Sequence, residues 1–274
     1  RHIASGEIMH SRTPPFDEAQ RLYIEQSSLG DRVRLPAGEA PGNATPLVIW
    51  DVGLGAAANA MAAIRCYEAQ AAGGPVRPMH IVSFETDLDS LRLAVSHIDK
   101  FHYLRHSGPA GILDRGQWQS RHYPGLSWTL VTGDFFQTLG AAPGPPDLIF
   151  YDMFSSNTAA DLWSLDAFRR VFDGCRNHPA ELFTYTCSTA IRAALLGAGF
   201  HVATGRGTGA KKETTIALTP AAIDPASPSR HALLPADWLR RWTRSHAQFP
   251  LGLPEAERAA VEQRIREHPQ FRGA

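Results

Sequence analysis

The sequence is poor in cysteine and has no long apolar segment. Its 274 residues include three cysteines, which are far apart and form no C-x-x-C pair: Cys66, Cys175 and Cys187. This usage is typical of reduced, mostly buried thiols in a cytoplasmic protein and argues against a secreted disulfide scaffold. No apolar run approaches the roughly 20 residues that a membrane-spanning helix needs. We therefore expect a cytoplasmic protein without a membrane partner.

The chain also lacks an excess of charge of either sign, since it has 27 basic and 27 acidic residues. A nucleic-acid partner would therefore have to bind a local basic patch. The sequence has no internal repeat. His102 and His106 have i, i+4 spacing but no third ligand, so no metal site is predicted. Cys187 follows a predicted strand and is expected in the core, and we find no Ser-His-Asp or Cys-His arrangement.

From residue 46 onward, short apolar strands alternate with helical segments. One predicted helix covers 159–175, and the pattern is less regular over 103–126. The strands are apolar at nearly every position, which is typical of a parallel sheet covered by helices on both faces. No helix separates the last two strands, which predicts a terminal antiparallel hairpin. We expect seven strands, at 46–53, 79–85, 127–134, 146–152, 180–186, 200–207 and 211–219.

This alternation divides the chain into an N-terminal extension, a main domain and a C-terminal extension, at 1–45, 46–220 and 221–274. The first extension has a predicted helix at 16–28 between short strands at 6–11 and 31–35. The last begins with a linker rich in Pro, Ser and Ala, and continues with two polar-faced helices at 235–249 and 254–268.

Acidic residues stand at the carboxyl ends of four successive strands of the predicted sheet: Asp51, Glu85, Asp134 and Asp152. In open α/β sheets, ligands bind at this edge. A single acid in such a place is most often a helix N-cap or a solvated carboxylate. Four of them on one edge predict a binding site.

The turn after the first strand is poor in side chains. It reads G-L-G-A-A-A, a loose and by itself weak match to the dinucleotide pattern G-x-G-x-x-G/A. Gly53 and Gly55 let the backbone turn tightly and approach a ligand. Asp51, just before them, would repel a pyrophosphate but suits the positive amino and sulfonium groups of S-adenosylmethionine, which favours this cofactor over NAD. Glu85 suits hydrogen bonds from the ribose hydroxyls, and Asp134 suits one from the adenine amino group.

Three segments together resemble one family, the S-adenosylmethionine-dependent methyltransferase half of the bacterial enzyme that modifies the tRNA wobble uridine (MnmC-type). The segments are HIVSFETDLDSLRLAVSH, DLIFYDMFSSNTAADLWSLDAF and LLGAGFHVATGRGTGAKKETTIAL. The second is the most specific, and the resemblance covers roughly residues 45–220. It implies a Rossmann-like class I methyltransferase fold, with a mostly parallel seven-stranded sheet that ends in an antiparallel hairpin. It also implies methylation of the exocyclic amine of 5-aminomethyl-2-thiouridine in tRNA.

The resemblance implies a set of site residues as well. Those for the cofactor are Asp51, Gly53, Leu54, Gly55, Asn59, Glu85, Thr86, Asp134, Phe135 and Asp152. Those for the substrate are Phe154, Trp163, Arg206, Lys211 and Lys212. In this scheme Glu85 holds the ribose, Asp134 holds the adenine, and Asp152 lies beside the transferring methyl group.

The sequence departs from the family pattern in two loops. The glycine loop, which usually reads G-F-G-T-G-L-N, has Ala57 at its third glycine. On the substrate side, Met153 and Ser156 replace a glycine and a proline, which affects the identity of the acceptor more than cofactor binding. No flavin-binding oxidase half is recognisable after residue 220. We therefore expect the substrate to arrive in its free aminomethyl form, or to have its carboxymethyl group removed elsewhere.

An alkyl ammonium must lose its proton before it can attack a methyl group. We expect Asp152, with Tyr151 nearby, to accept or relay this proton. The alternative is that Asp152 only caps the next helix or orients the cofactor. Phe154 and Trp163 are candidates for stacking on a flipped base, although aromatic residues of this kind are more often core. Basic residues that can contact phosphates form two clusters, Arg206, Lys211 and Lys212, and Arg105, His106, Arg121 and His122.

Three other functions stay open at this stage. The altered loop 152–156 is compatible with a methyl or aminopropyl transferase that uses a small amine. Ala57 and Met153 are compatible with a catalytically inactive RNA-binding relative. An NAD-dependent dehydrogenase has least support, because no second catalytic domain or hydride-site histidine pattern is visible. The sequence does not indicate the oligomeric state.

Overall fold

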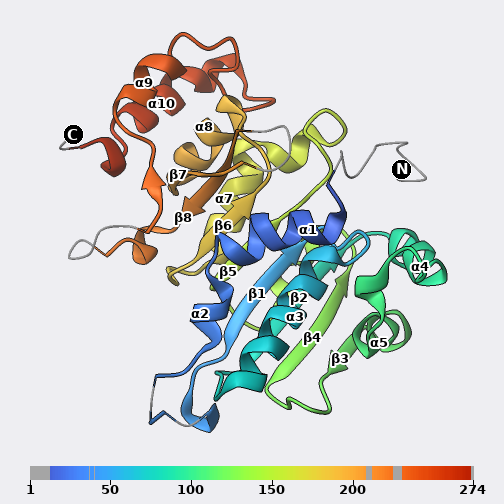
Figure 1. Cartoon of the computed structure of the whole chain (residues 1–274). Helices are drawn as coiled ribbons and strands as arrows, with labels where there is room; N and C mark the ends of the chain where they lie inside the picture. The colour runs from blue at the N-terminus through green and yellow to red at the C-terminus, as the bar shows by residue number, and fades with distance from the viewer. Residues whose placement is uncertain (1–12, 37, 40, 208–211, 225–229, 273–274) are drawn as a thin grey trace. The chain divides into compact units, whose positions relative to one another are not determined.

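The computed structural model describes residues 13–36, 38–39, 41–207, 212–224 and 230–272. The chain forms two compact units that divide between Asp152 and Met153 (Figure 1). Each unit has its own strands and its own covering helices, and each is described by itself below. The boundaries predicted near residues 45 and 220 stay predictions. No helix among the described residues is long and apolar enough to cross a membrane.

The first unit is built on strands in the order β3-β4-β2-β1-β5. Strand β2 pairs in parallel with β1 and β4, and β1 pairs in parallel with β5, whereas β3 runs antiparallel to β4. The central strands are buried along most of their length, as expected for apolar strands covered on both faces. The strands are β1 (Leu47–Val52), β2 (Met79–Glu85), β3 (Gln117–Gln119), β4 (Leu126–Thr132) and β5 (Leu148–Tyr151).

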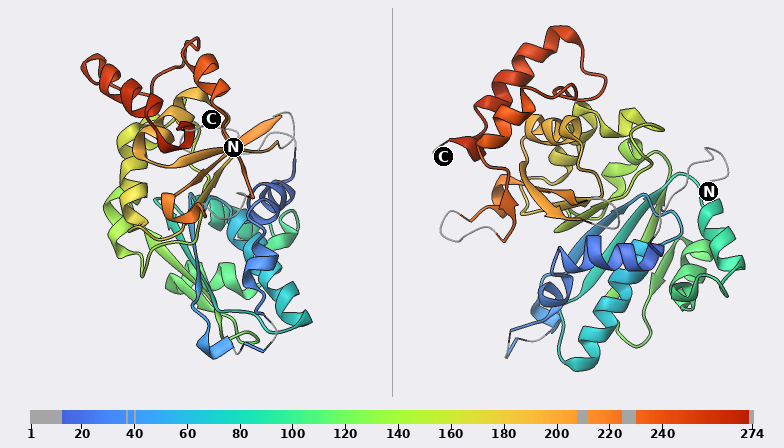
Figure 2. Two further views of the ribbon diagram at one scale, coloured as in Figure 1. Left: turned by 90° about the vertical axis from the view of Figure 1, so that its left-hand side faces the viewer. Right: turned by 45° about the horizontal axis from the view of Figure 1, so that its top comes forward.

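Helices α1 and α3 lie on the same face of this sheet and pack against each other (Figures 1 and 2). The alanines of the first turns of α3 are almost completely buried, and their small side chains let the helix lie close to the strands. The helices are α1 (Pro15–Ala19), which continues as a π-helical turn (Gln20–Glu25), α2 (Leu29–Val33), α3 (Ala58–Gly73), α4 (Asp89–Ser96), α5 (Ser107–Arg115) and α6 (Phe135–Thr138). Short 3-10 turns cover Pro41–Asn43, His102–Leu104 and Leu139–Ala141.

The second unit has antiparallel strands in the order β6-β8-β7-β9. The predicted terminal hairpin is confirmed, because β7 and β8 pair from His201 and Leu218 up to Arg206 and Glu213 beside the turn. The strands are β6 (Glu181–Thr184), β7 (His201–Arg206), β8 (Glu213–Leu218) and β9 (Ala232–Leu233). The helices are α7 (Leu165–Gly174), α8 (Thr189–Ala198), α9 (Asp237–Trp242) and α10 (Glu255–Arg266), with 3-10 turns at Ala160–Trp163, Pro220–Ala222 and Pro269–Phe271.

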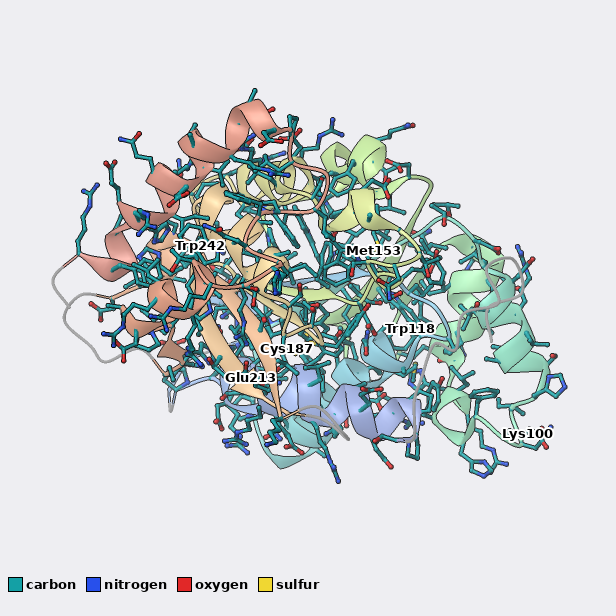
Figure 3. The ribbon with its side chains drawn as sticks, turned by 90° about the horizontal axis from the view of Figure 1, so that it is seen from above. Lys100, Trp118, Met153, Cys187, Glu213 and Trp242 are labelled. Atoms are coloured by element: carbon teal, nitrogen blue, oxygen red, sulfur yellow. The ribbon has the colours of Figure 1, made fainter. Side chains whose placement is uncertain are left out.

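The C-terminal segment is fastened to the sheet of the second unit. Helix α10 packs on α8 (Figure 2), and the rings of Trp238, Trp242 and Phe271 stack in a row. Trp242, labelled in Figure 3, is fully buried. The Gln270 side chain accepts a hydrogen bond from the backbone N–H of Val202 and donates to the carbonyl of the same residue. Residues 268–271 therefore extend the packing of the sheet edge.

Several local predictions were wrong. The predicted strand at 31–35 is mostly helix α2, because Leu29 and Val33 share one buried helical face. Only Arg34 makes an isolated β-bridge, to Val76. The predicted strand at 6–11 lies outside the described residues. The predicted helix at 159–175 is interrupted at Ser164, whose hydroxyl accepts a hydrogen bond from the N–H of Ala167 and so caps a separate helix α7.

The strand number also differs, since the described residues form nine strands and not seven. The additional strands, β3 and β9, are two or three residues long and lie at sheet edges, where weak patterns are hard to recognise. The expected core position of Cys187 was wrong as well, because this thiol is exposed. Cys175 is buried, and burial raises its pKa to about 12; burial also raises the pKa of Cys66, to about 11.

Candidate functional site

The structure brings the four predicted acids to one edge of the first unit. Strands β4, β2, β1 and β5 are parallel neighbours, so their carboxyl ends lie side by side. Asp51 is the next-to-last residue of β1, Glu85 ends β2, and Asp152 directly follows β5. Asp134 stands two residues after β4, as the N-cap of α6. An edge with this many carboxylates favours a cationic ligand.

The glycine loop between β1 and α3 has the backbone geometry that the sequence predicted. Gly53 and Gly55 have φ angles of 91° and 50°, in the region that favours glycine. The N–H of Gly55 donates a 2.9 Å hydrogen bond to Oε2 of Glu85. The other oxygen of this carboxylate accepts a 2.8 Å hydrogen bond from the N–H of Thr86. Oε1 also accepts longer 3.3 Å bonds from the Thr86 hydroxyl and the Asp87 N–H. The Glu85 carboxylate is thus oriented from both sides, and Oε2, which has a single donor, keeps an acceptor position.

Ala57, at the third glycine position of the loop, adopts a left-handed conformation with φ 60° and ψ 26°. For a residue with a Cβ this costs about 1–2 kcal/mol. The methyl group is fully buried, which contributes about 0.8 kcal/mol. Alanine also restricts the unfolded chain more than glycine does, by about 0.4–1 kcal/mol. These effects nearly cancel, which explains why the loop keeps its shape without a third glycine.

Asp51 lies at the centre of a buried polar chain that crosses three strands. The hydroxyl of Ser83 on β2 donates a 2.7 Å hydrogen bond to Oδ2 of Asp51, and the indole N–H of Trp128 on β4 donates a 2.8 Å bond to the Ser83 hydroxyl. All three side chains are completely buried. The second oxygen of Asp51, Oδ1, is buried and has no hydrogen-bond partner.

A buried carboxylate oxygen without a hydrogen-bond donor is unfavourable, because nothing compensates for its loss of hydration. Burial raises the pKa of Asp51 to about 7; the Ser83 hydroxyl lowers this pKa, the carboxylates of Asp152 and Glu85 raise it, and the Asn59 amide lowers it slightly. A ligand that brings positive charge or an N–H donor to this oxygen would supply the missing hydrogen bond and stabilise the ionised carboxylate. The residues present therefore fit S-adenosylmethionine, whose amino and sulfonium groups are cationic.

Asp152 is connected to the cofactor loop through Asn59. The side-chain amide of Asn59, in the first turn of α3, donates a 2.9 Å hydrogen bond to Oδ2 of Asp152. The N–H of Asp152 donates to the carbonyl of Val52 at 2.9 Å, so its backbone still follows the sheet register. Asp152 is half-buried, whereas Tyr151 beside it is fully buried and packs edge-on against Phe135. Asp152 is therefore held in position at backbone and side chain.

The other residues predicted for the cofactor lie around this loop with varied roles in the fold. Asp134 is exposed and accepts a 3.0 Å hydrogen bond from the N–H of Gln137, so it has the ordinary capping role that is common for such acids. Phe135 is buried against Phe84, with ring centroids 4.9 Å apart. Leu54 is also buried. Contacts of these residues with a cofactor stay predictions.

The residues predicted for the substrate belong to the second unit, where the loop after Asp152 is fixed by two hydrogen bonds. The Tyr185 hydroxyl donates to the Met153 carbonyl at 3.1 Å, and the indole N–H of Trp163 donates to the Phe154 carbonyl at 2.7 Å. Trp163 is fully buried and packs edge-on against Tyr185. It supports the loop, so of the two predicted aromatic platforms only the half-buried Phe154 keeps an accessible ring.

Two of the three predicted basic residues of the hairpin are described by the structure. Arg206 is exposed at the end of β7, and Lys212 is exposed just before β8. Lys211 lies outside the described residues. Glu213, next along β8, accepts a 3.0 Å hydrogen bond from the guanidinium of Arg192 on α8. Arg192, which is buried, also donates to the Thr215 hydroxyl and the Thr214 carbonyl, so the start of β8 is firmly attached to α8.

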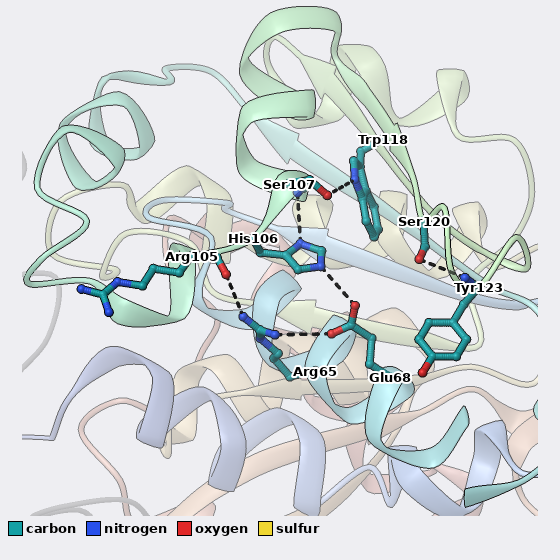
Figure 4. A network of polar contacts seen from close by, with 9 residues as sticks. Arg65, Glu68, Arg105, His106, Ser107, Trp118, Ser120 and Tyr123 are labelled. Atoms are coloured by element: carbon teal, nitrogen blue, oxygen red, sulfur yellow. Dashed lines mark hydrogen bonds and ion pairs between the residues drawn. The ribbon is translucent and has the colours of Figure 1, made fainter. Parts of the chain in front are cut away.

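The second predicted basic cluster includes a residue with a structural role, His106. Its Nδ1 accepts from the N–H of Gly108 and caps α5, and its Nε2 lies 3.1 Å from Oε1 of Glu68 on α3 (Figure 4). Arg65 joins the same network, since it contacts Glu68 and donates to the Arg105 carbonyl. Among the described residues no group of three or more His, Cys, Asp or Glu side chains is arranged to hold a metal ion.

Sequence reasoning missed three residues that shape the site. Ser83 and Trp128 sit inside strands that looked uniformly apolar, and only the polar Ser83 at mid-strand was a signal. Tyr103 lies in the stretch described as irregular, yet its hydroxyl donates a 3.0 Å hydrogen bond to the carbonyl of Ala56 in the glycine loop. Contacts across 47 residues leave no local pattern in the sequence.

Comparison with known proteins agrees with this geometry. Residues 114–220 match a family model described as S-adenosyl-L-methionine-dependent methyltransferase. The tRNA 5-methylaminomethyl-2-thiouridine biosynthesis bifunctional protein MnmC of Chromobacterium violaceum is 26% identical over 217 residues, which cover 76% of this chain and 31% of that protein. Its counterpart from Burkholderia vietnamiensis is 25% identical over 270 residues, which cover 93% of this chain and 36% of that protein. The chain spans about a third of the length of these two relatives.

A solved structure shares the fold. The crystal structure of MNMC2 from Aquifex aeolicus superposes with a TM-score of 0.66 at 19% sequence identity, covering 96% of this chain and 78% of that chain. The chain is thus similar in sequence to MnmC proteins and in fold to MNMC2. This likeness confirms the predicted Rossmann-like class I fold. The family model over residues 114–220 confirms the predicted use of S-adenosylmethionine.

Proposed function

We propose that this protein methylates the exocyclic amine of 5-aminomethyl-2-thiouridine at the wobble position of tRNA, with S-adenosylmethionine as methyl donor. The similarity to MnmC proteins over most of the chain supports this reaction. The observation that carries the proposal is the hydrogen bond from Asn59 to Asp152. It holds a carboxylate next to the glycine loop at the acidic edge of the first unit.

The cofactor loop provides a place for each part of the donor. Asp51 offers its orphaned Oδ1 to the cationic methionine portion, and Glu85 offers its remaining acceptor position to the ribose hydroxyls. Gly53 and Gly55 keep side chains away from the donor. When bound, S-adenosylmethionine supplies an electrophilic methyl group on a positively charged sulfur.

The chain itself has to free and orient the amine. The Asp152 carboxylate, which the amide of Asn59 holds at Oδ2, accepts the proton of the substrate ammonium. The freed amine would then be ready to take the methyl group of a donor held by Asp51, Glu85 and the glycine loop. The proton passes from Asp152 to water. Proton transfer of this kind contributes typically 10²–10⁴-fold to a rate, and alignment of amine and methyl group contributes more.

Phosphate contacts from exposed Arg206 and Lys212 would hold the tRNA. Because such contacts release counterions, the affinity for tRNA should fall steeply as salt increases. An affinity that does not respond to salt would argue for a small acceptor.

The test is methyl incorporation from labelled S-adenosylmethionine into tRNA that carries 5-aminomethyl-2-thiouridine, with nucleoside analysis by mass spectrometry. The proposal predicts a gain of one methyl group on this nucleoside. Two matched controls are the same tRNA with unmodified wobble uridine and the same tRNA with a carboxymethylaminomethyl group, and neither should be methylated. Methylation of small amines without methylation of the tRNA would contradict the proposal.

A further inference from the structure

The glycine loop is contacted by a residue that lies far from it in the sequence. Tyr103 belongs to the 3-10 turn His102–Leu104 between α4 and α5, and its hydroxyl donates a 3.0 Å hydrogen bond to the carbonyl of Ala56. Ala56 is the residue just before Ala57, which has the strained left-handed backbone. This hydrogen bond therefore acts next to the residue of the loop whose backbone is strained.

Aromatic neighbours fix the ring of Tyr103. Phe16 on α1 stacks on it, with ring centroids 5.5 Å apart and an interplanar angle of 20°. Phe101 packs edge-on against it at 6.2 Å and 89°. Burial also raises the pKa of Tyr103 above its usual value, so the hydroxyl stays protonated and remains a donor at all pH values where the protein is folded.

The peptide group between Ala56 and Ala57 is consequently anchored at both ends. Its C=O accepts from Tyr103 at 3.0 Å, and its N–H donates to the carbonyl of Leu54 at 2.7 Å. A rotation of this peptide group would change φ of Ala57 and release the strain of about 1–2 kcal/mol. The two hydrogen bonds oppose that rotation, and without the one from Tyr103 the relaxed loop would become populated.

We propose that Tyr103 is a positioning residue for the cofactor loop, held in place by Phe16, and that it keeps the Ala56–Ala57 peptide group in the orientation that admits the donor. This inference rests on the proposed use of the loop for S-adenosylmethionine. A loop that is only partly in the competent conformation binds with an affinity reduced by that fraction. The N-terminal helix α1 thereby contributes to cofactor affinity, although it has no residue at the acidic edge.

The test compares Tyr103→Phe with Tyr123→Phe. Both variants lose one hydroxyl and keep the ring, but the hydroxyl of Tyr123 has no hydrogen bond within the described residues, and Tyr123 precedes the amino end of β4. For Tyr103→Phe we expect S-adenosylmethionine to bind about three- to tenfold more weakly in calorimetry, as for the loss of one hydrogen bond. We expect kcat at saturating donor to stay within about twofold of wild type. Tyr123→Phe should match wild type in both.

A second background separates positioning from a general loss of stability. In Ala57→Gly the left-handed conformation costs nothing, so the loop no longer depends on Tyr103. Tyr103→Phe should then weaken binding by less than about twofold, and the double-mutant cycle should show the coupling. Equal losses in both backgrounds would overturn the proposal.

Hydrogen exchange provides a readout that needs no cofactor. The amides of residues 53–61 should exchange faster in Tyr103→Phe than in Tyr123→Phe. Unchanged exchange, or a donor affinity equal to that of Tyr123→Phe, would refute the role of Tyr103. Failure of wild type to bind S-adenosylmethionine would instead refute the proposed function, and the exchange comparison would still decide on Tyr103.

Discussion

The side-chain amide of Asn59 and the carboxylate of Asp152 meet at 2.9 Å although 93 residues separate them in the chain. Asn59 follows the loop that is shaped for a cofactor, and Asp152 precedes the loop that is predicted to meet the substrate. An amide nitrogen only donates, so the bond holds Oδ2 of Asp152 as an acceptor. The pair links the predicted cofactor site to the proposed base.

Asp152→Asn tests the base, because asparagine keeps the size of the side chain and can still accept the bond from Asn59 through its amide oxygen. We expect kcat to fall by roughly 10²–10⁴-fold, while the affinity for S-adenosylmethionine changes by less than about threefold. Steady-state kinetics and calorimetry measure the two quantities. As a control, Asn59→Ala should lower kcat less, since the carboxylate is present but no longer held. Normal turnover by Asp152→Asn would leave Asp152 with an orienting role only.

The affinity for S-adenosylmethionine should depend on pH through Asp51. Burial raises the pKa of this carboxyl to about 7, and a cationic ligand stabilises its ionised form. Binding near pH 7 should therefore release protons, and affinity should rise from pH 6 to pH 8 and level off above. Calorimetry in buffers with different ionisation enthalpies counts the protons.

Two variants identify Asp51 as the group that titrates. In Ser83→Ala the carboxylate loses a hydrogen bond that lowers its pKa, so the rise in affinity should move to higher pH. In Asp51→Asn the proton release should vanish. The other acids that face this group, Glu85 and Asp152, remain in both variants, so proton release that persists in Asp51→Asn would assign the effect to one of them.

The free energy of unfolding should respond to pH in opposite senses at two buried groups. Burial and the neighbours His201, Arg264 and Arg272 lower the pKa of His268 to about 4, below its ordinary 6.5. Its contribution is complete above pH 6.5 and is lost as pH falls toward 4. The raised pKa of Asp51 acts the other way without cofactor, since its contribution is complete below pH 4 and is lost as pH rises to 7.

Each group can change stability by about 3–4 kcal/mol across its range. The wild-type profile between pH 4 and 7 should therefore be flatter than the profiles of two variants that each lack one group, His268→Gln and Asp51→Asn. Denaturant unfolding of His268→Gln should show stability that falls as pH rises. Unfolding of Asp51→Asn should show stability that falls as pH is lowered. Parallel profiles for the two variants would contradict these assignments.

Arg192 should be the most sensitive polar residue of the second unit. Its guanidinium is almost completely buried and makes hydrogen bonds to Glu213, Thr214 and Thr215. Arg192→Lys cannot reproduce this fork, because a lysine has a single nitrogen. We expect it to lower the free energy of unfolding by about 3 kcal/mol or more, measured by denaturant unfolding. Arg169→Lys on α7, where the guanidinium pairs with exposed Asp166, is the matched surface control and should change stability by less than about 1 kcal/mol.

The sequence predicted the parts of the fold that depend on strong, local patterns. Apolar strands such as 79–85 and the glycine loop were recognisable because burial on both faces and backbone freedom restrict the residue types. The edge strand β3 and the helix α5 were missed, because three or nine residues whose packing partners are distant show little periodicity. The segment at 31–35 shows the limit clearly. Val33 fits both a strand and a helix, and only its packing with Leu29 decides.

The site was predictable where one residue type serves one purpose, as for the acids at the strand ends and Gly53 and Gly55. It was not predictable where function depends on pairs. Nothing local shows that Asn59 reaches Asp152 or that Tyr103 reaches Ala56, because these bonds join separate segments. Asp134 shows the reverse, since its position at a strand end is explained by capping of α6 alone.

The contrast among the three thiols has a practical consequence. Cys66 and Cys175 are shielded, and at neutral pH their high pKa values leave almost no reactive thiolate. Cys187, in contrast, is exposed in the loop between β6 and α8. A maleimide dye should therefore attach at a single place in the unaltered protein. That gives a fluorescent reporter in the second unit without engineering a cysteine-free background.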